Sequence, residues 1–324
     1  VCISDNNSTE DVESVVNDYN DKLKIKFHKN PKNLGLGINI LKSVELSNAE
    51  FAWIIGNDDM IFAHTLDKIN NMFKKYPKVD YFFVNSNHLS SEFVFSHKQP
   101  FDHKNLPKNM EPFSKKKNDL LCNYFDLIRP DFSFDFLLGM FLNIFRREMW
   151  EKNLNQIDFN LIKDTKVMSN IYNTFPHNII FAKAFNNSKA FFHSNPLIIS
   201  LYGERNWWKD LYPFVEAIRI PELVDVYRKN GMHYFRYMIC KNFAVRKLLH
   251  NMIKISLYPA AVVANYPGSQ DMPLNVPKTT PNKEWSGRSP PHTAMWYVPE
   301  RNWNNNLRNE IGRTYARKHS ILFL

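Results

Sequence analysis

The stretch Phe51-Ala-Trp-Ile-Ile-Gly-Asn-Asp-Asp59 decides how this chain folds. Its first five residues are apolar or aromatic and predict a buried strand. Gly56 follows, and a glycine lets the backbone turn sharply or approach a ligand closely. Asp58 and Asp59 come just past the strand, where open α/β sheets bind their ligands.

Two adjacent carboxylates at this place have two interpretations. Hard oxygen ligands suit Mg²⁺ or Mn²⁺ held against a diphosphate. Alternatively, Asp58 or Asp59 is only the N-cap of the next helix. The neighbouring segments are needed to choose between a metal site and a helix cap.

Strands and helices alternate along the first 85 residues. We expect strands at 1–5, 24–28, 51–56 and 80–84, and helices at 9–19, 37–48 and 66–76. This alternation indicates an α/β fold with a mainly parallel sheet covered by helices on both faces.

Beyond residue 85 the pattern is less regular. Residues 88–118 predict a long irregular insertion; we then expect helices at 119–128, 146–153 and 161–172, and strands at 179–184 and 190–201. The chain becomes helical and basic after about 208, and 305–324 predicts one basic helix. We therefore divide the chain into an α/β domain over 1–205 and a helical, basic region over 206–324.

Composition limits the classes of partner. The 324 residues carry a formal net charge of +10, which favours polyanions. The sequence has no zinc spacing and no recognisable nucleic-acid module, so we expect no nucleic-acid partner. A phosphate-linked substrate or an anionic membrane surface suits the charge better.

Cysteine usage and hydropathy predict a cytoplasmic protein. Cys2, Cys122 and Cys240 lie far apart and form no disulfide framework, which suits a reducing compartment. We see no signal peptide and no run of about 20 apolar residues that would span a bilayer.

Three segments should meet at one edge of the sheet. Asp5 ends the first strand, Asn33-Leu-Gly35-Leu-Gly37-Ile-Asn39 opens a helix, and Asp58-Asp59 ends a later strand. Asp5-Asn6 could also be a simple turn former. The glycines lack the third member of a dinucleotide-binding fingerprint, so that match is weak.

The sequence resembles nucleotide-sugar glycosyltransferases of family 2, which have the GT-A fold. The resemblance is carried by Ser4-Asp5-Asn6-Asn7-Ser8-Thr9-Glu10, Asn33-Leu34-Gly35 and Trp53-Ile54-Ile55-Gly56-Asn57-Asp58-Asp59. The spacing is most similar to the abequosyltransferase-like branch, which builds bacterial surface polysaccharide such as lipopolysaccharide or capsule. The resemblance implies a nucleotide-sugar donor, a glycan or polyprenyl-linked acceptor, a divalent metal (Mn²⁺ or Mg²⁺) and inversion at the anomeric carbon.

The resemblance also implies roles for particular residues. Asp5 would accept a hydrogen bond from the nucleotide base, within a nucleotide-binding set made of Asp5, Asn7, Asn33, Gly35 and Asp58. Asp59 would ligate the metal, and Asp58 would bind ribose or a metal-bound water. Asn57 stands where many members carry a third acid, which leaves the assignment within this motif open.

A general base should take the proton of the acceptor hydroxyl. Asp164 is the closest match to the family's base, because it follows the Phe145-Arg146-Arg147 unit at the expected place; Asp158 and Glu148 are the other candidates. Asp164 could instead occupy the first turn of a helix, where the helix dipole favours an acid.

Two further segments have candidate binding roles. Arg205 and Trp207 could bind substrate, Arg205 through a phosphate and Trp207 through an apolar sugar face, although the tryptophans could equally pack the C-terminal helices onto the sheet. The basic, aromatic chain from about 225 onward suits peripheral contact with an anionic membrane at its inner face, or else an ordinary solvated helical subdomain.

Family members begin with a strand and helix that this chain lacks. The absent strand lies centrally in the family, between the strands that carry Asp5 and Asp58. We therefore expect a fragment of a longer protein, with unpaired backbone groups and a gap in the core at that place.

Function has three alternatives at this stage. We favour a metal-dependent glycosyltransferase. A non-catalytic nucleotide- or glycan-binding domain on the same scaffold, or a metal-dependent nucleotidyltransferase, would use the same acids.

Overall fold

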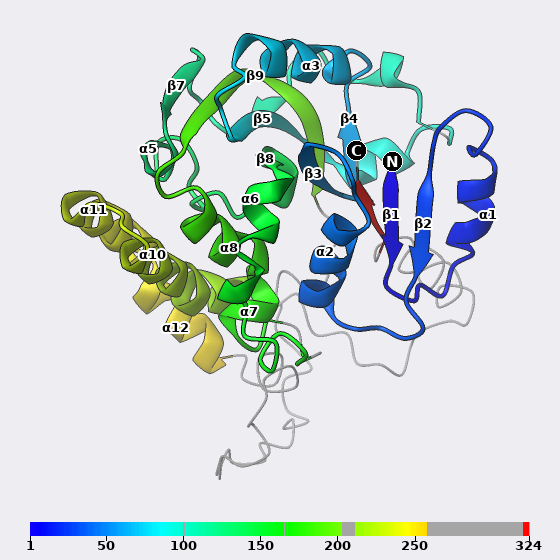
Figure 1. The fold of residues 1–324 in the computed structure, drawn as a ribbon. Helices are drawn as coiled ribbons and strands as arrows, with labels where there is room; N and C mark the ends of the chain where they lie inside the picture. The colour runs from blue at the N-terminus through cyan, green and yellow to red at the C-terminus, as the bar shows by residue number, and fades with distance from the viewer. Residues whose placement is uncertain (100, 165, 167, 203–210, 258–319, 324) are drawn as a thin grey trace, which may run out of the picture.

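A mixed sheet forms the centre of the molecule (Figure 1). The computed structural model describes residues 1–99, 101–164, 166, 168–202, 211–257 and 320–323. The strand order is β2–β1–β10–β3–β8–β5–β9–β4. The strands are β1 (Cys2–Asp5), β2 (Lys26–Lys29), β3 (Phe51–Gly56), β4 (Asp59–Ile61), β5 (Tyr81–Ser90), β8 (Asn143–Arg146), β9 (Lys189–Tyr202) and β10 (Ser320–Phe323), with β6 (Glu111–Pro112) added to β5 and β7 (Leu120–Asn123) added to β9.

Strand direction determines where the strand ends meet. Strands β1, β2, β3, β5 and β9 run one way, while β10, β8 and β4 run the other way. The carboxyl ends of the five strands with a common direction therefore lie along one edge. The expected mixed sheet, parallel in the direction of most of its strands and flanked by helices, is confirmed.

Helices cover both faces of this sheet. The helices α2 (Leu36–Glu45), α6 (Arg147–Glu151), α8 (Pro176–Ala184) and α10 (Ile220–Lys229) share one hydrophobic core with the sheet, and α3 (Thr65–Lys75) shares a second one. Ala52 and Ile54 of β3 belong to the first core, while Trp53 and Ile55 belong to the second. Burial on both faces explains why this strand is apolar at every position.

Strand β10 occupies the place where the sequence predicts a gap. It lies between β1 and β3 and pairs antiparallel with both, Asp5 opposite Ser320 and Gly56 opposite Ile321. The expected unpaired backbone rows are therefore absent here, because residues 320–323 supply the hydrogen-bond partners. The predicted basic helix is wrong for 320–323, and 305–319 lie outside the described residues.

Three other expectations from the sequence are wrong in whole or in part. Residues 179–184 form the end of α8 rather than a strand, because the helix lies inside the core and is apolar on nearly every side. Residues 161–172 are mostly turns, with only the short α7 (Ile171–Thr174) at their end. Residues 119–128 divide into β7 and α5 (Tyr124–Leu127) because the first half pairs with β9.

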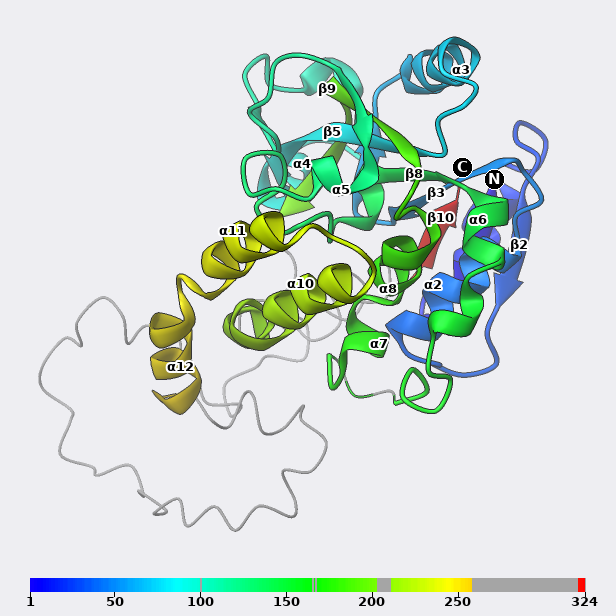
Figure 2. The same ribbon diagram turned by 60° about the vertical axis from the view of Figure 1, so that its left-hand side comes forward.

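The remaining helices are short or lie at the two ends of the chain. α1 (Val12–Asn17) and α4 (Ser91–Phe95) sit beside the sheet, with single 3₁₀ turns at η1 (His103–Asn105), η2 (Met140–Leu142) and η3 (Leu154–Gln156). The π-helical η4 (Val215–Arg219) leads into α10, α11 (Tyr234–Val245) and α12 (Leu248–Leu257), as the sequence predicts. Figure 2 shows these C-terminal helices on the side of the molecule away from β1 and β2.

The domain boundary at 205–206 stays a prediction, because residues 203–210 lie outside the described part of the chain. Within the described part, no helix combines the length and the apolar character that crossing a bilayer requires.

A buried histidine ties α8 to the loop before β8. His177 is 2% exposed, and its Nε2 donates to the Leu138 carbonyl at 3.0 Å. Burial lowers the pKa of His177 to about 4, because the charged imidazolium would lose its hydration. The unfolded chain therefore binds one more proton than the folded chain between pH 4 and 6.5.

This difference predicts an acid-sensitive fold. Stability contributed by neutral His177 is complete above pH 6.5 and is lost as the pH falls toward 4. From the two pKa values we expect a loss of about 2 kcal/mol between pH 7 and pH 5. In the His177→Gln variant this part of the pH dependence of the free energy of unfolding should disappear. Urea unfolding at both pH values measures it; an unchanged slope in the variant would refute the assignment.

Candidate active site

Asp5 lies at the carboxyl end of β1 and is fully buried. Its Oδ1 accepts a hydrogen bond from the Ser8 backbone N–H at 2.8 Å, so the turn-forming role is real. Its Oδ2 accepts no hydrogen bond from the described residues and lies 4.0 Å from Lys29 Nζ. A buried carboxylate oxygen without a donor is costly, and a ligand N–H would satisfy it.

A network of asparagine side chains shapes the loop beside Asp5. Asn6 Oδ1 accepts from the Leu34 N–H at 2.9 Å, and Asn6 Nδ2 donates to Asn33 Oδ1 at 2.9 Å. Asn33 Oδ1 also accepts from the Gly35 N–H. Gly35 has φ +85°, a conformation that favours glycine, and it immediately precedes α2. These contacts join the ends of β1 and of the loop before α2.

Further polar contacts continue the network into the core. Ser4 Oγ donates to Asn39 Oδ1 at 2.7 Å, and Asn30 Nδ2 donates to the same oxygen. Asn7 stands just outside, exposed and with φ +65°. The structure thus gives Asn33 and Gly35 a role in loop conformation, and the nucleotide-binding roles of Asn7, Asn33 and Gly35 stay predictions.

Asp58 and Asp59 fold back over the end of β3. Asp59 Oδ2 accepts from the Gly56 N–H at 2.9 Å. A Cβ placed on Gly56 would stand 2.5 Å from Asp58 Oδ1, so a side chain at this position would displace the Asp58 carboxylate. Asp59 then opens β4, opposite Ser200 of β9.

The helix-cap alternative for these acids is wrong. Helix α3 begins at Thr65 and its N-cap is His64, well beyond the acid pair. Asp58 and Asp59 therefore belong to the strand connection and not to a helix start.

Asp5 and the acid pair lie at the same edge of the sheet. β10 separates β1 from β3, and its register places Asp5 beside Ser320 and Gly56 beside Ile321. Asn57, which follows Gly56, is therefore level with Asp5 along the strand direction. The two residues lie two strand spacings apart, roughly 10 Å. The register therefore brings the Asp5 segment and the Asp58–Asp59 segment to the same edge, as expected from the sequence.

A metal ion fits this donor set only together with a ligand. Among the described residues, no three His, Cys, Asp or Glu side chains gather closely enough to hold a metal. Two adjacent carboxylates are nevertheless the protein share of a typical Mg²⁺ site, in which substrate phosphates and waters supply the other oxygens. Asp58 and Asp59 fit that chemistry.

Asp164 lies in the turn region before α7, and not at the start of a helix as expected. Its Oδ1 accepts from the Lys166 N–H at 3.0 Å. Asn173 Nδ2 donates to the carbonyls of Asp164 and Lys166, at 2.9 and 2.8 Å, and fixes this turn. The helix-dipole alternative therefore does not apply.

The turn with Asp164 packs against α2. Ile162 is fully buried, and a Cβ on Gly37 would meet its Cγ1 at 2.8 Å and the Asn173 Cα at 3.1 Å. Because α2 begins at the Asn33–Gly35 loop, this contact connects the Asp164 turn to the Asp5 end of the site.

The two rival bases have local roles. Asp158 Oδ1 accepts from the N–H groups of Asn160 and Leu161, which makes it a turn former. Glu148 is exposed and bonds Lys152, which lowers the pKa of Glu148. Arg205 and Trp207 lie outside the described residues.

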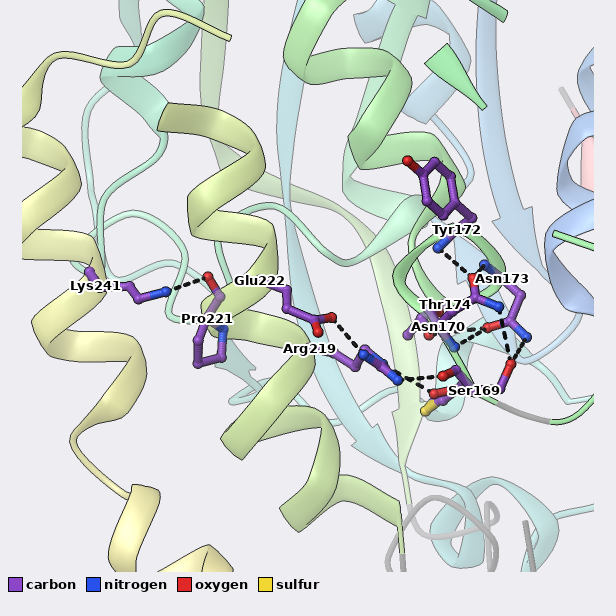
Figure 3. Close-up of polar contacts among 10 residues, drawn as sticks. Ser169, Asn170, Tyr172, Asn173, Thr174, Arg219, Pro221, Glu222 and Lys241 are labelled. Atoms are coloured by element: carbon purple, nitrogen blue, oxygen red, sulfur yellow. Dashed lines mark hydrogen bonds and ion pairs between the residues drawn. The ribbon is translucent and has the colours of Figure 1, made fainter. Parts of the chain in front are cut away.

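Sequence reasoning missed Arg219, which holds the same turn from the other side (Figure 3). Its guanidinium is 4% exposed and donates to the carbonyls of Met168 and Ser169, while Glu222 pairs with it at 2.6 Å. Met168 has φ +57°, which is strained for a side chain of its size. Isolated arginines rarely signal such a role in a sequence, because both acceptors are backbone carbonyls.

Residues 1–136 match the family described as "Glycosyl transferase family 2". This part of the chain is similar to that family. The family 2 match covers Asp5, Asn33, Gly35, Asp58 and Asp59, and it ends before Asp164.

Two known proteins are similar to this chain, one in sequence and one in fold. "Abequosyltransferase RfbV" of Salmonella typhimurium is 40% identical over 70 residues, which are 20% of this chain and 20% of RfbV. The crystal structure of S. aureus TarS 1-349 in complex with UDP superposes with a TM-score of 0.51 at 15% identity, covering 80% of this chain and 65% of TarS. The likeness to TarS concerns the fold, and the chain spans less than two thirds of either protein.

The Arg219 contacts predict a stability effect. In Arg219→Met the carbonyls of Met168 and Ser169 lose a buried charged donor, so we expect a loss of about 2–4 kcal/mol in urea unfolding. Arg129→Met is the control, because Arg129 pairs with Asp131 at the surface and should cost about 0–1 kcal/mol. Equal losses in both variants would contradict the role of Arg219.

Proposed function

We propose that this chain transfers a sugar from a nucleotide-diphosphate donor to a glycan or polyprenyl-linked acceptor in the assembly of bacterial surface polysaccharide. The observation that carries the proposal is the placement of Asp5 and the Asp58–Asp59 pair at one sheet edge, about two strands apart. This spacing suits a ligand with a base at one end and a diphosphate at the other. The match to family 2 supports it.

The donor would lie along this edge from Asp5 toward Asp59. Asp5 Oδ2 is buried without a donor, so it can accept a hydrogen bond from a base N–H. Asp58 would bind ribose. TarS, which has the same fold, is known in complex with UDP. These points favour a nucleotide sugar, without naming the base or the sugar.

Asp59, with Asp58 beside it, would hold a divalent cation, Mn²⁺ or Mg²⁺. When bound, such a cation neutralises charge that develops on the diphosphate leaving group. The chain's own contribution is to hold the two carboxylates over Gly56, where the backbone N–H of Gly56 orients Asp59.

Asp164 would act as the general base. The acceptor hydroxyl oxygen forms a bond to the anomeric carbon, the bond from that carbon to the diphosphate oxygen breaks, and the hydroxyl proton passes to the Asp164 carboxylate. A single displacement of this kind inverts the anomeric centre. Asn173 holds this region through the Asp164 carbonyl. Arg219 holds it through the carbonyls of Met168 and Ser169.

The acceptor assignment rests on the similarity to a curated protein whose name states an activity. RfbV is described as an abequosyltransferase. A glycan on a polyprenyl carrier would place the reaction at the inner face of the membrane, in the cytoplasm. A binding domain without turnover, or a nucleotidyltransferase, remains the alternative.

Asp59→Asn tests the metal. The variant should lose the Mn²⁺-dependent part of its affinity for nucleoside diphosphates, roughly tenfold or more, because one carboxylate charge is removed. Titration calorimetry with UDP, GDP and CDP, with and without Mn²⁺, measures it. Asp67→Asn on the exposed side of α3 is the matched control. If Asp59→Asn keeps the full Mn²⁺ effect, the metal assignment fails.

Asp164→Asn separates catalysis from binding. We expect kcat for sugar transfer to fall about 10²–10⁴-fold, with nucleotide affinity unchanged, because only the proton acceptor is lost. The substrates are the nucleotide sugar that most stabilises the protein in a thermal-shift screen and lipid-linked glycan from bacterial membranes. Asp158→Asn should leave kcat within about threefold. Nucleotide binding without any transfer in the unaltered protein would favour the binding-domain alternative, and formation of a nucleotide sugar from a sugar phosphate would favour the nucleotidyltransferase.

A further inference from the structure

Two C-terminal helices expose apolar side chains with the same spacing. On α11 the exposed residues are Tyr234, Phe235, Met238 and Ile239; on α12 they are Leu248, Leu249, Met252 and Ile253. Phe235 is 73% exposed and Leu249 is 76% exposed. Positions i, i+1, i+4 and i+5 lie on one side of a helix, so each helix presents a continuous apolar stripe. We call these eight residues the apolar stripe.

The inward side of α11 packs on the hydrophobic core and also makes polar contacts. Lys241 bonds Asp225 and the Pro221 carbonyl, Tyr237 donates to Asp225, and Arg236 pairs with Asp126. Cys240 is buried beside the Ile128 carbonyl. These contacts hold the inward side of α11 against the protein and leave its part of the apolar stripe exposed.

Positive charge accompanies the apolar stripe. Residues 226–257 contain Arg228, Lys229, Arg236, Lys241, Arg246, Lys247 and Lys254, and they contain no Asp or Glu. Arg236, Lys241 and Lys247 pair with acids outside the segment, so its excess positive charge comes from Arg228, Lys229, Arg246 and Lys254. Lys254 is exposed within α12 itself. An apolar stripe with basic flanks matches a bilayer whose headgroups are anionic.

The two helices lie together at the periphery of the fold. Figure 2 shows α11 and α12 following one another along the outer edge, with α10 between α11 and the rest of the helical layer. A hollow lined by Phe134, Tyr212, Glu216, Phe243 and Arg246 lies beside the turn that joins them. Nothing among these lining residues belongs to the candidate active site.

We propose that α11 and α12 bind the surface of an anionic bilayer, with the apolar stripe in the headgroup region. Within the basic, aromatic chain from about 225 onward, Tyr227 is fully buried and Tyr237 bonds Asp225. The contact therefore belongs to the exposed side chains of the apolar stripe, Tyr234 among them. Burial of this apolar area and attraction of the cations act together, as in other interfacial helices.

The docking surface is connected to the Asp164 turn. Lys241 joins α11 to α10 at Pro221, and Arg219, two residues earlier, holds the carbonyls of Met168 and Ser169 (Figure 3). Through these contacts, membrane-bound α11 and α12 would bring a lipid-linked acceptor toward Asp164, an idea that rests on the proposed function. Binding to the bilayer does not depend on it.

Vesicle co-sedimentation tests the docking with the full chain and no nucleotide or acceptor. We expect binding to vesicles with 30 mol% phosphatidylglycerol, and roughly tenfold or weaker binding to pure phosphatidylcholine. Phe235→Glu combined with Leu249→Glu should reduce binding to the anionic vesicles at least tenfold. Val15→Glu combined with Leu121→Glu is the control, since both residues are similarly exposed elsewhere.

A second pair of variants isolates the charge. Lys254→Glu should weaken binding about tenfold, while Lys183→Glu, an exposed lysine of α8, should change it less than twofold. Circular dichroism checks that all variants are folded. Equal binding by the stripe variant and its control would overturn the proposal. So would a concentration-dependent dimer, seen by light scattering, that the stripe variant abolishes while vesicle binding is absent. Loss of sugar transfer alone would bear only on the proposed function.

Discussion

The close approach of two carboxylates to the backbone at Gly56 is the constraint on which the candidate site depends. A side chain there would displace the Asp58 carboxylate from its place beside the end of β3. The buried strand brings that glycine to the level of Ser4, one residue before Asp5, and the backbone N–H of Gly56 orients Asp59. A hydrophobic strand and the absence of a side chain at Gly56 thus contribute to the position of the acid pair.

Strands and acids that carry strong local signals could be predicted from the sequence. The strand at 51–56 and the shared edge of Asp5 and Asp58–Asp59 follow from an apolar run and its end. Residues 179–184 could not be assigned correctly, since a helix inside the core has no polar face that would show its period. Two contacts also could not be predicted: the bond between Asn6 and Asn33, and the bonds of Arg219 to backbone carbonyls. In both cases the partners are far apart in the sequence.

The Asp164 turn is held from two directions. Asn173 binds it from α7, and Ile162 fits against Gly37 at the start of α2. Arg219 reaches the same turn from the C-terminal helices. A residue in irregular backbone can keep a defined position when buried donors bond the carbonyls of its neighbours. A turn region can therefore position a side chain as well as the end of a helix does.

The position of β10 has a consequence for how this chain reaches its fold. Cys2 of β1 pairs with Lys26 nearby and also with Phe323, so β1 joins segments that lie almost a whole chain apart. Such pairings raise contact order and must close a very long loop before they contribute any free energy. Among the described residues, only 320–323 fill the slot between β1 and β3, which is open before they pair there. An open slot of this kind is an exposed strand edge, where a foreign extended segment can pair first.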